Sequence, residues 1–233
     1  MTSTTPALPF PVSPRRPGDP EPDLFGFSLV HRALRSGCRL LADAVTAVAA
    51  GDPCPPERQR AVVRFGEAVL HEVHVHHSRE DDVLWPVIVA SAGDAVDLRP
   101  LSDDHTALQG VLDRADSALA RFAEGGPAQA GPLTAVLTEL ADELDEHIEE
   151  EEREVFPVMR RFVSKGDFTR VETRFRKGTS PRHMVFVLPW IVDSCRTPAE
   201  TARLFAGAPA PLRWVLRAVQ PGWIRRRDLV RGA

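Results

Sequence analysis

Apolar residues recur at helical spacing in four long stretches of the chain. In the first stretch Leu34, Cys38, Leu41 and Val45 share one face, and most residues of the opposite face are polar or small. The four stretches cover residues 23–50, 56–91, 101–123 and 132–164. The pattern predicts four amphipathic helices, and the short segments between them favour antiparallel neighbours. The expected fold class is therefore all-α: an up-down four-helix bundle with a short helical C-terminal appendage.

Turn-forming residues separate the predicted helices. The first stretch ends at Gly51, which Asp52 and Pro53 follow, and the third ends at Gly125 and Gly126. Ser102, which two aspartates follow, is a typical capping residue for the start of the third helix.

The chain divides into three predicted parts. Residues 1–22 are rich in proline and lack the continuous apolar core of a secretory signal, so we expect a disordered leader. Residues 23–164 form the bundle, and residues 165–233 form a basic extension of short helices packed on it. No apolar run reaches the ~18–20 residues that a transmembrane helix needs. Three widely spaced cysteines favour reduced thiols in a cytoplasmic protein over a disulfide framework.

Charge is distributed unevenly along the chain. Residues 1–159 contain 13 Lys/Arg against 28 Asp/Glu, whereas residues 160–233 contain 16 against 5. A basic tail could bind an acidic protein, a membrane surface or a nucleic acid. The simpler interpretation is that the tail docks on its own acidic bundle, so we expect no nucleic-acid partner, and a protein partner stays unidentified.

Two polar segments interrupt the apolar stripes of the second and fourth helices. They read HHSREDDVLWP and HIEEEEREVFP, and they match at an offset of 71 residues. His76 and Glu80 therefore correspond to His147 and Glu151, and in each pair the two side chains lie one helical turn apart on one face. This spacing lets one helix offer two donors to a single metal site.

The first and third helices each add one histidine to the apolar stripe, in the matching segments HRAL and HTAL. A lone histidine on such a stripe is more often a hydrogen-bonded core residue, and a lone HxxxE is usually a solvated ion pair. Here a histidine recurs on the stripe of all four helices, which favours metal binding. The predicted metal ligands are His31, His76, Glu80, His105, His147 and Glu151.

Six donors suit two metal ions better than one. Each half of the repeat would supply two imidazoles to its own ion, and Glu80 and Glu151 would bridge the two ions. Imidazole and carboxylate without thiolate fit iron or manganese and argue against a structural zinc site built on cysteine, although they do not exclude zinc or cobalt.

The remaining histidines of the second helix, His71, His74 and His77, are predicted to point away from the His76 stripe and to lie at the surface, because successive helical residues differ by about 100°. His77 and Asp81 nevertheless form a competing pair with the spacing of His76 and Glu80. Candidates to support the ligands from just outside the site are Glu72, Gln109, Glu143 and His77.

On these motifs the chain resembles the hemerythrin-like, or HHE cation-binding, family over about residues 24–164. The resemblance implies a four-helix bundle with a non-haem di-iron centre, Fe²⁺ or Fe³⁺, bridged by two carboxylates and an oxo or hydroxo group. It also implies reactivity toward O2, peroxide or NO. One departure is Gln109, which stands four residues after His105 where the oxygen carriers of the family have another histidine. With one imidazole fewer, stable oxygen carriage is less expected than peroxide turnover or redox sensing.

The expected function is binding or reduction of a small oxidant at this His/Glu centre, and whether the protein is an enzyme stays open. One alternative is an iron or redox sensor that signals through the basic tail. Another is a di-iron oxygenase acting on an organic substrate, although such oxygenases usually carry more carboxylates in an ExxH order.

Overall fold

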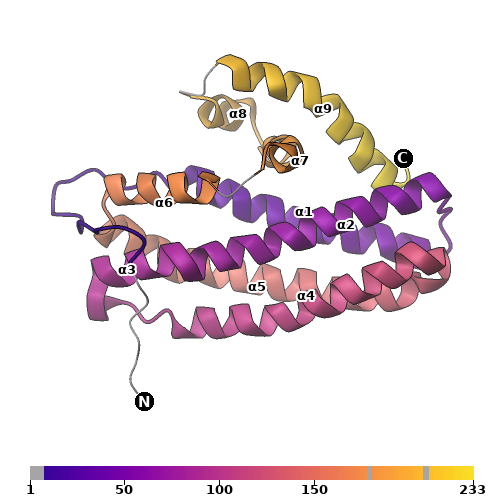
Figure 1. The fold of residues 1–233 in the computed structure, drawn as a ribbon, viewed down its shortest axis with the longest axis horizontal. Helices are drawn as coiled ribbons and strands as arrows, with labels where there is room; N and C mark the ends of the chain where they lie inside the picture. Colours follow the sequence, from indigo (N-terminus) through magenta and orange to yellow (C-terminus); the bar gives the residue numbers. More distant parts are fainter. Residues whose placement is uncertain (1–7, 178–179, 207–209) are drawn as a thin grey trace.

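A computed structural model describes residues 8–177, 180–206 and 210–233. All regular structure in these ranges is helical (Figure 1), which confirms the all-α prediction. The helices are α1 (Phe25–Ala49), α2 (Pro56–Arg79), a π-helical turn (Glu80–Leu84), α3 (Trp85–Ala92), α4 (Arg99–Gly125), α5 (Ala130–Phe162), α6 (Lys165–Lys177), α7 (Pro181–Asp193), α8 (Pro198–Leu204) and α9 (Ala210–Arg231). Short 3-10 turns at Gly93–Ala95 and Gly126–Gln129 complete the set.

The four long helices α1, α2, α4 and α5 lie side by side. Helix α1 packs against α2 and α5, and α4 packs against the same two helices (Figure 1). Their apolar stripes face inward and bury Leu41, Phe65, Leu112, Phe122 and Leu140 almost completely. Each such side chain stabilises the fold by roughly 1.5–3 kcal/mol relative to an exposed one. This packing holds the polar residues on the same stripes away from water.

The second predicted helix is not continuous. After α2 the backbone widens into the π-helical turn at Glu80–Leu84, in which the Trp85 N–H donates to the Glu80 carbonyl. The ring of Pro86 would clash with the carbonyl of Asp82 in a regular α-helix, but Pro157, at the matching position of the repeat, lies inside the continuous helix α5, so the proline alone does not account for the turn.

Helix α4 also begins earlier than predicted, at Arg99, and the expected capping residue has another role. The Ser102 hydroxyl donates to Asp81 Oδ1 at 3.1 Å, which links α4 to the π-helical turn.

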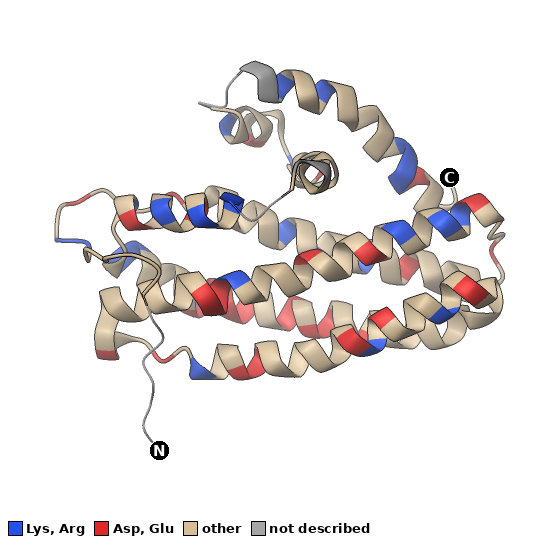
Figure 2. Cartoon of the chain, viewed as in Figure 1, with Lys and Arg blue, Asp and Glu red and all other residues tan. Residues whose placement is uncertain are grey.

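Helices α7 and α9 lie over α1 and α2 (Figure 1), and Phe186, Trp190 and Trp223 of these helices join the core of the bundle. Trp190 is only 3% exposed, and its ring lies 6.4 Å from Phe65 and 6.2 Å from Trp223, centre to centre. A glycine on α1, Gly37, makes room for this ring, because a Cβ there would lie 2.3 Å from Trp190 Cζ2. In Figure 2 many acidic residues lie on α4, α5 and the π-helical turn, and basic residues are frequent on α6 and α9.

Residues 8–22, most of the predicted leader, contact α5 and α6 through backbone hydrogen bonds. The Ser13 N–H donates to Asp167 Oδ2 at 2.8 Å, and the Arg15 N–H donates to the Phe162 carbonyl at 2.8 Å. These bonds hold the segment against the start of α6, where Asp167 is buried. The rest of the predicted leader, residues 1–7, lies outside the described residues.

Within the described ranges, no helix combines the length and the apolar character that a membrane span requires.

Candidate metal centre

Four of the predicted ligands meet inside the bundle. His31 of α1, His76 of α2, Glu80 of the π-helical turn and Glu151 of α5 each offer one donor atom within 4.8 Å of the others. His76 Nε2 lies 3.1 Å from Glu80 Oε1, and His31 Nε2 lies 3.4 Å from Glu151 Oε2. All four side chains are buried, and the two carboxylates have no exposed surface.

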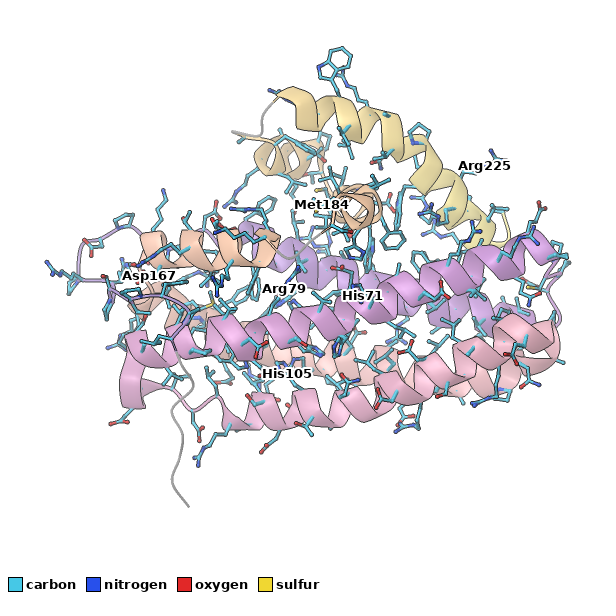
Figure 3. All side chains as sticks on the ribbon, in the orientation of Figure 1. His71, Arg79, His105, Asp167, Met184 and Arg225 are labelled. Carbon is cyan, nitrogen blue, oxygen red and sulfur yellow. The ribbon has the colours of Figure 1, made fainter. Side chains whose placement is uncertain are left out.

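A second group consists of three histidines, His77, His105 and His147, again with donor atoms within 4.8 Å of one another. His105 and His147 approach through their Nε2 atoms at 3.1 Å. The prediction that His77 points toward the surface is wrong. Its side chain is 5% exposed, and its ring stacks on His105 at 4.3 Å (His105 is labelled in Figure 3).

Glu80 lies between the two groups and faces both. Its Oε1 points to His76 of the first group, and its Oε2 lies 3.6 Å from Nε2 of His105 in the second. The five imidazoles and two carboxylates therefore form two adjoining groups of buried donors that meet at Glu80.

The family model of the hemerythrin HHE cation-binding domain matches residues 27–159. The chain belongs to this family. The match includes every donor of both groups and confirms the resemblance drawn from the sequence motifs. Neither the curated proteins nor the solved structures give a significant match.

The donors of this HHE domain fit cations because most of their polar atoms make no hydrogen bond. The atoms without a hydrogen bond include Nε2 of His31, His76 and His77, Nδ1 of His147, and both carboxylate oxygens of Glu80 and Glu151. Each buried polar group left unsatisfied costs about 1–3 kcal/mol, and more if it is charged. Cations bound by these atoms would remove this cost.

Acidic residues hold two of the rings from outside the pocket. Asp81 Oδ2 lies 3.0 Å from His105 Nδ1, and Glu152 Oε1 lies 2.9 Å from His31 Nδ1. Such a bond fixes the tautomer and leaves Nε2 free as the donor. Asp81 and Glu152 directly follow Glu80 and Glu151 and obey the same offset of 71 residues, so the sequence repeat could have revealed them.

Of the four supporting residues proposed from the sequence, His77 lies in the second group of donors, and the other three lie elsewhere. Glu72 makes its contact with His183 of α7, and Gln109 bonds to the surface residue His74, with Oε1 2.7 Å from Nδ1. Glu143 is half-buried on α5, and no hydrogen bond or ion pair found among the described residues joins it to a ligand histidine.

Burial and charge shift the pKa values of the donors strongly. Burial, with the charge of Glu151, raises the pKa of Glu80 well above its usual range. Burial lowers the pKa of His76 well below its ordinary value and that of His147 to about 3. For His31 burial also acts to lower the pKa, but Glu151, Glu152 and Glu80 together outweigh it and raise the pKa to about 10. His76 and His147 are therefore neutral at pH 7, the form in which an imidazole binds a metal.

A pocket of about 610 Å³ adjoins the first group of donors. The C-terminal extension forms much of its wall, and His76 and Phe27 are part of its lining. Other apolar lining residues are Phe168 and Phe175 of α6 and Met184 and Trp190 of α7.

Proposed function

We propose that the protein holds two iron ions at this centre and uses them to bind or reduce a small oxidant, namely O2, peroxide or NO. The proposed ligands are the six predicted residues, His31, His76, Glu80, His105, His147 and Glu151, together with His77. Glu80 and Glu151 are the proposed bridges. Manganese or zinc would fit the same donors, and cytoplasmic iron is the metal that we favour.

The observation that carries the proposal is the placement of Glu80. Its two oxygens face two separate groups of buried nitrogen donors, at 3.1 Å from His76 and 3.6 Å from His105. A carboxylate in this position can bind one ion through each oxygen. A structural role alone would not require both of its oxygens to lack a hydrogen bond.

His77 changes the interpretation of Gln109. The sequence suggested one imidazole fewer than in the oxygen carriers, but His77 offers a third imidazole to the group of His105 and His147. Reversible oxygen binding is therefore no longer disfavoured, and carriage stays beside turnover in the proposal.

Two iron ions, when bound, supply one-electron redox steps at neighbouring positions. The chain's own residues set the conditions for this chemistry. Asp81 and Glu152 orient the rings of His105 and His31. The ring of Phe27 lies 4.6 Å from that of His31, and the ring of Trp85 lies 6.0 Å from that of His105, measured between ring centres. These aromatic rings help to keep bulk water from both imidazoles, which are buried.

The test is iron loading followed by optical titration with azide, peroxide and O2. Wild type should bind two irons per chain and change its visible spectrum with these ligands, and His147→Ala should lose iron and the spectral change. The exposed histidine His74 provides the matched control, because His74→Ala should behave as wild type. Wild type with fewer than two irons, or with no spectral response, would refute the proposal.

A second candidate function is oxidation of an organic substrate, and the pocket beside His76 favours it. A volume of 610 Å³ with aromatic and aliphatic walls is typical of small-molecule sites. Val187→Trp, which places a large side chain on the wall of this pocket, separates the two functions. Azide and peroxide titrations should be unchanged if only small oxidants react. If an organic substrate is oxidised, a product carrying an added oxygen atom should form in wild type and not in the variant.

The sensor alternative has less support. Trp190 and Trp223 of the basic extension are buried against the bundle and so are not available to a partner, whereas Trp214 of α9 is 69% exposed.

A further inference from the structure

A third cluster of metal-binding side chains lies outside the proposed centre, between α2 and α7. It consists of His71 and Glu72, which are adjacent on α2, and His183 of α7. One donor atom from each residue lies within 4.8 Å of the other two. Figure 3 labels His71 on α2 and Met184, the neighbour of His183, on the facing helix α7.

The three side chains converge on one another. His183 Nε2 contacts Glu72 Oε1, and the rings of His71 and His183 lie 5.0 Å apart at nearly a right angle. Glu72 is 8% exposed, His183 is half-buried and His71 is exposed. The cluster is thus anchored by a buried carboxylate and open to solvent at one side, through which an ion can enter.

Two imidazoles and one carboxylate form a donor set that zinc and ferrous iron both accept, with positions left for water. Burial raises the pKa of Glu72, whereas the neighbouring charges of Arg79 and His71 act to lower it. Burial also lowers the pKa of His183, so its ring is neutral at pH 7 and does not form a strong ion pair with the carboxylate. A divalent cation bound here would stabilise the charged form of the buried Glu72 carboxylate.

We propose that His71, Glu72 and His183 bind a single divalent transition-metal ion, zinc in the first instance, that ties α7 to α2. Glu72 and Met184 both belong to the lining of the 610 Å³ pocket. An ion at this site therefore braces the wall of the pocket next to the proposed di-iron centre. The site shares no residue with that centre, so the inference stands apart from the proposed function.

The test measures the number of zinc ions bound per chain of the full-length protein. The protein is first stripped of metal, then saturated with Zn²⁺, and passed through gel filtration to remove unbound ions. Wild type should retain one zinc more than His71→Ala. The variant is informative because His71 is exposed, so the fold should survive, and far-UV circular dichroism checks this. His74→Ala, three residues along the same helix, is the matched control and should keep the wild-type count. Glu72→Gln, which removes the carboxylate charge without changing size, should lose the same ion.

The difference between variants separates this inference from the proposed di-iron centre. If the proposed di-iron centre binds no metal, wild type binds fewer zinc ions in total, but His71→Ala still binds one zinc ion fewer than wild type. Zinc should also slow amide hydrogen exchange in α7 of wild type and not of His71→Ala. Equal zinc counts in wild type, His71→Ala and Glu72→Gln would overturn the proposal, as would zinc binding without an effect on exchange in α7.

Discussion

The docking of the C-terminal extension on the bundle can be tested at Gly37, in the middle of α1. An added Cβ at this position would lie 2.3 Å from Cζ2 and 3.0 Å from Cε2 of Trp190. The indole ring cannot easily retreat, because it packs 5.5 Å from Phe186 and 6.2 Å from Trp223, measured between ring centres. We therefore expect Gly37→Ala to destabilise the fold, although alanine favours helices.

The magnitude follows from two opposing effects. Replacing a glycine inside a helix by alanine stabilises by about 1 kcal/mol. Overpacking of a well-filled core costs roughly 1–3 kcal/mol. For Gly37→Ala the net loss of unfolding free energy is therefore between about zero and 2 kcal/mol. At Gly110 of α4 an added Cβ would meet no atom within 4 Å, so Gly110→Ala should show the gain alone.

Urea unfolding followed by circular dichroism, with both variants in the same metal state, measures the difference. Gly110→Ala should be more stable than Gly37→Ala by about 1–3 kcal/mol, the overpacking cost itself. For a chain of this size each kcal/mol corresponds to roughly 2–4 °C in melting temperature. If the two alanines stabilise equally, Trp190 does not lie against α1 and the described docking is wrong.

Three further predictions concern the metal centre and the thiols. His77→Ala should lower the iron content or affinity, whereas His74→Ala should not; equal iron binding by both variants would remove His77 from the ligand set. Asp81→Asn should weaken iron binding by about 10–100-fold, because the variant loses the charge that orients and polarises His105. Isothermal titration calorimetry measures the iron affinities, and equal affinities of wild type and Asp81→Asn would contradict this prediction. Burial, assisted by the charge of Asp145, raises the pKa of the Cys38 thiol to about 12. A thiol-reactive reagent at pH 8 should therefore modify Cys38 only after the protein has been unfolded. The pKa of Cys38 is higher in the folded protein than in the unfolded chain. The contribution of this thiol to the unfolding free energy is therefore complete below about pH 8.5 and is lost as pH rises toward 12. Rapid modification of Cys38 in native protein at pH 8 would contradict its burial.

The sequence was sufficient for the helices and for the meeting of six donors. Apolar spacing located α1, α2, α4 and α5, because a stripe of this period is buried only when helices pack together. The repeat at 71 residues then paired His76 and Glu80 with His147 and Glu151, and all four are buried in the structure.

His77 was misplaced because a single stripe was assigned to the second helix. Helix α2 packs on α1 at one side and on α4 at the other, so it has two buried directions. His76 and His77 differ by about 100° around the helix and each faces one of them. His76 therefore joins His31 of α1, and His77 joins His105 of α4.

The position of the C-terminal extension could not be predicted for a different reason. Amphipathic spacing indicates which face of a helix is buried, but it does not identify the partner. Only the fold shows that Trp190 meets Gly37, or that His183 reaches Glu72. The π-helical turn at Glu80–Leu84 was missed as well, although Pro86 marks its end.

The central claim is that two iron ions share Glu80, and magnetic measurements on the iron-loaded, oxidised protein test it most directly. We predict two antiferromagnetically coupled ferric ions per chain. Mössbauer spectra at low temperature should then show a diamagnetic ground state. Electron paramagnetic resonance should show no signal of an isolated high-spin ferric ion. A single iron per chain, or two ions that give uncoupled ferric signals, would contradict the claim.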